Sequence, residues 1–269
     1  MIGLSQKPLK MGKQLLLKKN LLMKNDEPRE YRFFKKYSEK IRKDNMDKFL
    51  TIPKRIQTCK NSVMYIFEYL DKDYKASKIP KLTWRKFLDY TIQVCLQIFY
   101  LNHNLKLFHH DLFTRAGGTK IRNMMVQYGN KEQILRVNEF EHIVKENKIR
   151  IIDFGYIRES PHYKLEEYYK KKMKNTPFYS EVFALLYLSY RSYLQKWIDF
   201  PSFFNSFYKS GMSHQDFDKK LIRRLIHAYK HSNFTNLFKD FNESTIKVSV
   251  GDLGSEDEKL AEVKRILGK

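Results

Sequence analysis

The chain has 269 residues, with 52 Lys and Arg against 30 Asp and Glu, so its formal net charge is +22. The composition, with 42% hydrophobic and 30% charged residues, excludes a disordered protein. No window approaches the roughly 18 uncharged apolar residues of a membrane-spanning helix, which excludes a membrane protein. Two cysteines cannot form a disulfide framework and residues 1–13 lack a signal core, so we expect a soluble protein of a reducing, intracellular compartment.

The N-terminal part contains short apolar runs around one helical stretch. Residues 15–17 and 21–23 are brief enough to be strands. Apolar side chains recur with helical spacing between residues 30 and 41, which predicts a helix there. The compact apolar run at residues 63–67 predicts a buried strand, and the polar residues 68–73 would form a connector.

The middle of the chain is expected to be a long amphipathic helix followed by a turn and two strands. The helix is predicted over residues 83–102, with candidate core positions at Phe87, Tyr90, Val94, Leu96, Ile98 and Leu101. A turn-like segment covers residues 107–112. Strands are predicted at residues 124–126 and 149–152, on either side of a polar excursion at residues 127–148.

The C-terminal part is expected to be mostly helical. Helical spacing is found at residues 178–197 and 216–231. Near the end, Ser255 opens a Ser-x-x-Glu capping box for a short helix that would end at Ile266. The order of elements therefore predicts an α+β protein, with a small mixed part followed by a larger helical one.

Three polar motifs follow one another between the long helix and the last predicted strand. Two β-branched residues run into Asp153-Phe154-Gly155, so that a strand would deliver an acid to a glycine turn. Such a tripeptide is common by chance. Upstream, however, His109-His110-Asp111-Leu112 follows the long helix, and Asn123 directly precedes the next predicted strand.

This layout resembles the catalytic and metal-binding loops of the protein kinase superfamily. The resemblance covers roughly residues 15–200 and is closest to the divergent serine/threonine kinases of large nucleocytoplasmic DNA viruses. It implies a bilobal fold with a minimal N-terminal lobe (residues 1–70), a mainly helical C-terminal lobe (residues 71–248) and a helical tail (residues 249–269). For a viral kinase it implies a location in the host cytoplasm or the virion.

The resemblance further implies transfer of the γ-phosphate of ATP, with Mg²⁺, to Ser or Thr hydroxyls of a protein substrate. This chemistry demands positioning and charge neutralisation rather than covalent catalysis. Asp111 would accept the proton of the attacking hydroxyl, and Asp153 and Asn123 would hold Mg²⁺. His109 would brace the catalytic loop, whereas His110 is expected to be a loop residue without a catalytic role.

Residues that would bind the nucleotide are assigned by the same resemblance. The run that ends at Lys18 matches the family's Val-Ala-Ile-Lys pattern and is preferred over the similar run that ends at Lys24. Glu30 would pair with this lysine, and the alternative is a solvated charge on a helix face. The hinge that contacts adenine is assigned to Phe67, Glu68, Tyr69 and Leu70.

The sequence departs from the family's pattern in both parts. Asn123 follows Asp111 by 12 positions instead of five, so that about seven residues are inserted in the catalytic loop. Phe113 stands in place of the usual loop lysine, and Glu181 in place of an Asp that normally anchors this loop. No glycine-rich G-x-G-x-x-G motif and no Ala-Pro-Glu motif is found.

The strong positive charge does not by itself decide the function. With 20 Phe and 18 Tyr it is typical of AT-rich codons and a solvated surface, and only residues 170–174 form a tight basic cluster. Binding of nucleic acid through this charge would be non-specific. The missing glycine-rich motif is compatible with a pseudokinase that keeps the fold without phosphoryl transfer. The positive charge is compatible with a kinase-like enzyme that acts on RNA or on a small molecule. A membrane partner is not expected, and the sequence does not indicate an oligomeric state.

Overall fold

The computed structural model describes thirteen stretches of the chain, which fall into two compact units. The described residues are 9–11, 15–21, 27–60, 62–68, 75–76, 84–112, 123–128, 131–145, 147–160, 178, 180–186, 204 and 207–231. Unit 1 comprises those within Met1–Ser77, Tyr100–Phe113 and Arg122–Ser160, and unit 2 those within Lys78–Phe99, Thr114–Ile121 and Pro161–Lys269. These units are not the predicted domains 1–70, 71–248 and 249–269, which stay a prediction.

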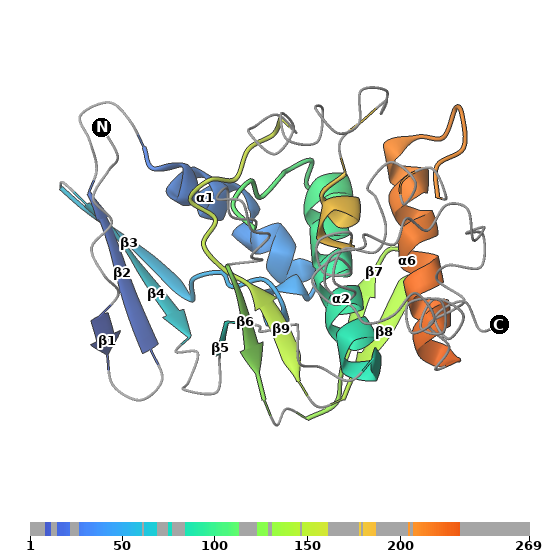
Figure 1. The fold of residues 1–269 in the computed structure, drawn as a ribbon. Helices are drawn as coiled ribbons and strands as arrows, with labels where there is room; N and C mark the ends of the chain where they lie inside the picture. Colours follow the sequence, from blue (N-terminus) through green and yellow to red (C-terminus); the bar gives the residue numbers. More distant parts are fainter. Residues whose placement is uncertain are drawn as a thin grey trace, which may run out of the picture. The chain divides into compact units, whose positions relative to one another are not determined.

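Unit 1 is built around an antiparallel sheet with the strand order β1-β2-β4-β3 (Figure 1). Its strands are β1 (Leu9–Met11), β2 (Leu15–Leu21), β3 (Arg55–Cys59) and β4 (Ser62–Glu68). The predicted strand at residues 63–67 is confirmed by β4, in which Val63, Tyr65 and Phe67 are buried with the period of two of a strand. Residues 15–17 are confirmed as strand, but they belong to one strand, β2, which runs unbroken to Leu21, and residues 22 and 23 lie outside the described residues.

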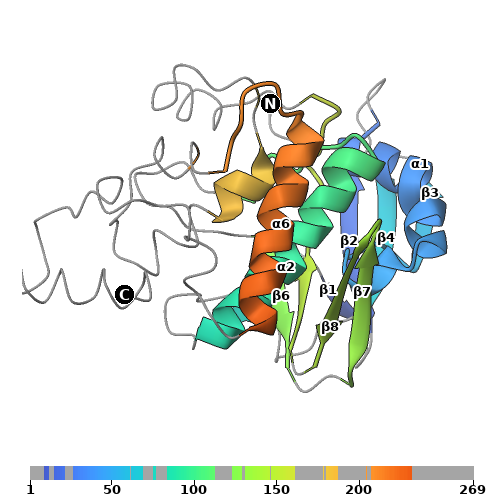
Figure 2. The same ribbon diagram turned by 90° about the vertical axis from the view of Figure 1, so that its right-hand side faces the viewer.

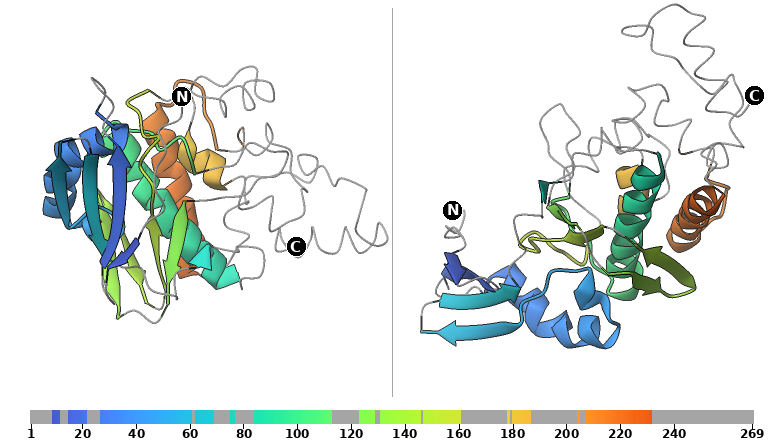
Figure 3. Two further views of the ribbon diagram at one scale, coloured as in Figure 1. Left: turned by 90° about the vertical axis from the view of Figure 1, so that its left-hand side faces the viewer. Right: turned by 90° about the horizontal axis from the view of Figure 1, so that it is seen from below.

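Helix α1 (Arg29–Lys43) lies on one face of this sheet, and it confirms the helix predicted at residues 30–41 (Figure 3). The ring of Phe34 contacts the rings of Tyr65 and Phe67 of β4, at centroid distances of 5.5 and 5.9 Å. The buried positions of α1 recur every three or four residues, as a single helix face requires. They are Glu30, Phe33, Phe34, Ser38 and Ile41.

Unit 1 also contains a three-stranded sheet and a separate hairpin. The sheet pairs β6 (Met124–Gln127) with β5 (Lys75–Ala76) and with β9 (Lys148–Ile151), all antiparallel, and confirms the two strands predicted near residues 124–126 and 149–152. The predicted polar excursion contains a hairpin of β7 (Gln133–Val137) and β8 (Phe140–Val144). Its two-residue turn begins at Asn138, whose φ of 51° suits a tight hairpin turn.

Unit 2 contains two helices that pack side by side, α2 (Trp84–Phe99) and α6 (His214–Lys230) (Figure 2). They confirm the helices predicted at residues 83–102 and 216–231. The amphipathic character expected of α2 is seen at its start, where Arg85 and Lys86 are exposed, whereas every residue from Tyr90 to Phe99 is buried. In the described part of the chain, no helix combines the length and the apolar character needed to cross a bilayer.

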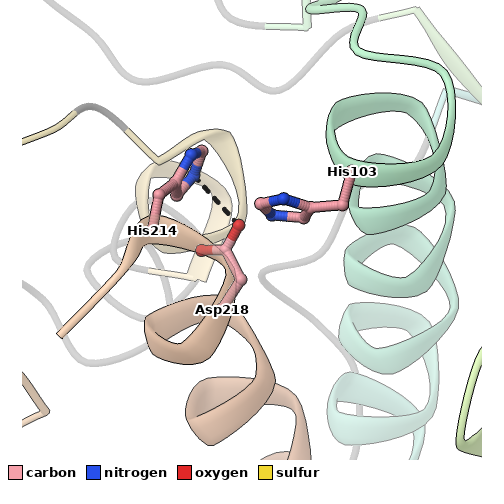
Figure 4. Close-up of side chains that lie close together, drawn as sticks. All are labelled: His103, His214 and Asp218. Carbon is pink, nitrogen blue, oxygen red and sulfur yellow. Dashed lines mark ion pairs between the residues drawn. The ribbon is translucent and has the colours of Figure 1, made fainter.

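A buried carboxylate ties residues 180–186 to α6 within unit 2. Asp218 is fully buried and accepts a 2.5 Å hydrogen bond from the Ser180 hydroxyl, which itself accepts from the backbone N–H of Phe183 at 2.9 Å. Asp218 also pairs with His214 at 3.1 Å (Figure 4, which draws His103 of unit 1 as well). Because an unpaired buried charge is costly, these contacts fix the two helical segments together.

Candidate active site

The chain enters the predicted catalytic loop through a wide helical turn in unit 1. After α2 the residues Tyr100–Asn104 form a π-helical turn, a feature frequent at functional sites. The Tyr100 hydroxyl donates a 2.7 Å hydrogen bond to Asp44 at the end of α1, and burial together with this bond raises the pKa of Tyr100. The Asn102 amide donates to the Leu107 carbonyl at 2.8 Å. The first bond ties the start of the loop to the end of α1, and the second closes the turn within the loop segment.

Asp111 and Asn123 lie in direct contact, although the chain between them is longer than in the kinase pattern. The Asn123 Nδ2 donates to the Asp111 carboxylate Oδ2 at 2.8 Å and to the Asp111 backbone carbonyl at 2.7 Å. Asn123 has a left-handed φ of 56°, which asparagine tolerates better than most residues. Both bonds use the amide nitrogen, so the amide oxygen of Asn123 is the atom that would bind a cation.

The segment that carries Asp153 is bound to the same loop. The backbone N–H of Ile152 donates to the Asn123 carbonyl at 2.9 Å, and the His109 Nε2 lies 3.0 Å from the Ile152 carbonyl. Asp153 has a φ of 60°, and the N–H of Gly155 lies 3.4 Å from its Oδ1. A Cβ at Gly155 would lie 3.3 Å from that oxygen, so the absence of a side chain there leaves space for the carboxylate.

Phe154 anchors this segment in the core of unit 1. It is fully buried, and its ring stacks on Phe33 of α1 at a centroid distance of 4.7 Å. Phe34 and the fully buried His109 lie 6.0 and 5.3 Å from the same ring. The helix that carries Glu30, the loop that carries Asp111 and the segment that carries Asp153 therefore share one aromatic cluster.

His110 contacts the chain beyond Gly155. Its Nε2 lies 2.6 Å from the Ser160 carbonyl, and its φ is 60°. Next to it, Phe108 and Arg158 exchange backbone hydrogen bonds at 2.7 and 3.0 Å. Residues 158–160 are thereby bound to the predicted catalytic loop, so His110 has a structural contact that the sequence did not indicate.

The structure places some of the residues predicted to bind the nucleotide, and others lie outside the described residues. Glu30 is only 4% exposed on α1, so the alternative that it is a solvated charge is wrong. Lys18 lies on β2 opposite Tyr65 of β4, and its pairing with Glu30 stays a prediction. Phe67 is buried and Glu68 is exposed at the end of β4. Tyr69, Leu70, Lys24 and Phe113 lie outside the described residues.

Two buried cations on β9 were missed by sequence reasoning. Lys148 is 7% exposed and Arg150 is 4% exposed, and strand alternation places both on one face of β9. Burial, and next the charge of Arg150, lower the pKa of Lys148 from 10.5 to about 8, while Glu68 acts in the opposite direction. The alternation of Lys148, Ile149, Arg150 and Ile151 was the available signal.

Lys148→Met is expected to raise stability at neutral pH and to remove a pH dependence. In the wild type the folded-state pKa of about 8 lies below the unfolded value of 10.5. The unfolded chain therefore binds more protons between these values, and the free energy of unfolding rises as the pH increases from 8 to 10.5. Urea unfolding across this range should show that rise in the wild type and a weaker one in Lys148→Met. An identical rise in both proteins would contradict the assignment to Lys148.

The donor set of this site suits a small hard cation. Asp153 contributes a carboxylate and Asn123 an amide oxygen, and Mg²⁺ is bound in proteins by one or two carboxylates with further oxygen ligands. The Asn123 side chain is held by Asp111 and its backbone by Ile152, so contacts within the protein fix the position of the amide. The residues present therefore fit Mg²⁺.

Comparisons with known proteins add little to this picture. No protein-family model and no curated protein matches the chain. Among solved structures, the chain is similar to the crystal structure of the PF14_0431 kinase domain, with 13% sequence identity and a TM-score of 0.41 over 98% of this chain and 84% of that chain. At these values the likeness establishes no family, and a functional proposal has to rest on the residues of this chain.

Proposed function

We propose that this protein is an ATP- and Mg²⁺-dependent protein kinase that phosphorylates Ser or Thr hydroxyls. One observation carries the proposal: Asn123 joins both loops, because its side chain binds Asp111 and its backbone carbonyl binds the N–H of Ile152, next to Asp153. A carboxylate that can serve as a base is thereby linked to a carboxylate and an amide that suit Mg²⁺. Phosphoryl transfer needs this combination.

Asp111 is the proposed catalytic base. The Asn123 amide donates to its Oδ2, and the carboxylate would accept the proton of the substrate hydroxyl. The same bond orients the carboxylate, and orientation of a reacting group lowers the barrier of a transfer step. The His109 contact with the Ile152 carbonyl braces the loop on its other side.

Asp153 and the Asn123 amide oxygen are the proposed Mg²⁺ ligands. When bound, Mg²⁺ would neutralise charge on the phosphates of ATP. The left-handed backbone at Asp153 directs the chain from β9 into the turn at Gly155, and the stacking of Phe154 on Phe33 holds it there. The position of the Asp153 carboxylate is thus the property that this segment contributes.

ATP itself is proposed to bind along β2 and the end of β4. Lys18 would contact its phosphates, with Glu30, which is buried on α1, as partner. The adenine would contact the backbone near Phe67 and Glu68 and the following Tyr69 and Leu70. The bilobal kinase arrangement, the resemblance to viral kinases and a location in the host cytoplasm or virion belong to the same proposal.

The test is phosphate transfer from radiolabelled ATP to a generic Ser- and Thr-containing protein, with Mg²⁺ present. We expect acid-stable phosphoserine or phosphothreonine with the wild type and none with Asp153→Ala. A wild type that transfers no more than Asp153→Ala would overturn the proposal. In that case a thermal shift with Mg-ATP would identify a pseudokinase, because a ligand that binds only the folded state stabilises it by mass action.

A further inference from the structure

Arg150 connects three segments of unit 1 from a buried position. It lies on β9, three residues before Asp153. One guanidinium nitrogen, Nη1, donates to the Glu68 carboxylate at the end of β4 at 3.2 Å. The other, Nη2, donates to the backbone carbonyls of Asp47 at 2.8 Å and Leu50 at 3.4 Å, in the segment that follows α1.

These contacts require arginine rather than any cation. A buried charge is tolerated only where it is paired and hydrogen-bonded, and the carboxylate and the two carbonyls supply partners for both terminal nitrogens of Arg150. The planar guanidinium donates in two directions at once, which a lysine ammonium on one stem does not reproduce. Lys148 lies on the same strand face, where the charges of Glu68 and Asp47 favour its protonated form and the charge of Arg150 disfavours it.

The backbone next to Arg150 is bound to the same segment. Ile151 forms a parallel bridge with Leu50, and the N–H of Thr51 donates to the Ile151 carbonyl at 3.0 Å. The place of β9 beside residues 47–51 is therefore set by backbone bonds at Ile151 and by the guanidinium at Arg150. Glu68 extends this set of bonds to the end of β4.

We propose that Arg150 is a positioning residue that couples nucleotide binding at the end of β4 to the position of the Asp153 carboxylate. The inference rests on the proposed function, because it takes adenine to bind beside Glu68 and Mg²⁺ to bind Asp153. A nucleotide that orders Glu68 would favour the arrangement of β9 in which Asp153 is in place. By linkage, Mg²⁺ would tighten ATP binding by the same factor as ATP tightens Mg²⁺ binding.

The experiment measures the dissociation constant of ATP with and without Mg²⁺ by calorimetry. The variants are Arg150→Met, Glu68→Ala and the double variant. The matched control is the exposed pair Arg136–Glu141 of the hairpin in the same unit, with a separation of 2.7 Å, changed to Arg136→Met and Glu141→Ala. The quantity of interest is the factor by which Mg²⁺ tightens ATP binding, which a loss of stability alone would not change.

We expect each single variant to lower this factor about fivefold or more, the double variant to lower it no further, and the control pair to leave it unchanged. A factor equal to that of the wild type, or losses that add in the double variant, would overturn the inference. Glu68→Ala keeps the test valid if Arg150→Met does not fold, since the Glu68 side chain is 53% exposed. A wild type that binds no ATP would instead refute the proposed function.

Discussion

Asp111→Asn is expected to lower kcat by about 10²- to 10⁴-fold, the usual contribution of a general base. The substitution preserves the volume of the side chain, and the amide oxygen can still accept the bond that Asn123 donates to Oδ2. The proton acceptor and the negative charge are lost. Because Asp111 is proposed to contact the attacking hydroxyl, the KM for ATP should change little. Steady-state phosphotransfer assays at varied ATP give both constants.

Asp89→Asn is the matched control for this prediction. Asp89 lies on α2 and accepts a hydrogen bond from Gln93 at 3.2 Å, so it undergoes the same chemical change in unit 2. Its kcat should equal that of the wild type. Retention of full activity by Asp111→Asn, or an equal loss in both variants, would show that Asp111 is not the base.

Phe154→Ala is expected to reduce the free energy of unfolding by about 3–5 kcal/mol. The ring is fully buried and contacts Phe33, Phe34 and His109, so its removal would leave a cavity among three segments. The cost exceeds the loss of hydrophobic transfer energy, because a rigid aromatic cluster collapses only in part. The midpoint and slope of urea unfolding measure the effect.

Tyr156→Ala, two residues further along, is the control for this stability prediction. Its side chain is 50% exposed, and surface substitutions usually change stability by within about 0.5 kcal/mol. The two variants should therefore differ by several kcal/mol. If both lost the same amount of stability, the core position of Phe154 would be refuted.

The sequence predicted best those elements whose apolar residues have a clear period. Helices α1 and α6 and strand β4 were located to within a few residues, because each hides one face or one alternating set of side chains. The long helix α2 was also found. The burial of all residues from Tyr90 to Phe99 was not predicted, because these include the polar residues Gln93 and Gln97.

Strand β3 and the β7–β8 hairpin were missed for a different reason. In β3, Arg55, Gln57 and Thr58 are exposed at the edge of the sheet, so no apolar alternation marks the strand. The hairpin does alternate, but exposed Ile134 and Ile143 on its outer face obscure the pattern. Both elements depend on pairing with a neighbouring strand, which a local pattern does not reveal.

The residue types of the candidate site could be predicted from the sequence, but the hydrogen bonds and ion pairs that join its segments could not. Asp111, Asn123 and Asp153 were selected because their chemistry suits phosphoryl transfer, and the contact of Asn123 with Asp111 holds despite the longer loop. The roles of these residues stay predictions. Arg150 was included only as a residue of the strand predicted at residues 149–152, because its partners are backbone carbonyls and a carboxylate 82 positions away.

The left-handed backbone at Asn123 and Asp153 restricts how these positions can change during evolution. Asparagine and aspartate are among the few residues with a side chain that accept such φ values, here 56° and 60°. Glycine would satisfy the backbone and lose the oxygen ligand, whereas glutamine and glutamate would keep the oxygen on a residue less suited to this conformation. The backbone conformation and the need for an oxygen ligand therefore constrain the same two residues. We expect few substitutions at either position among related proteins that keep the activity.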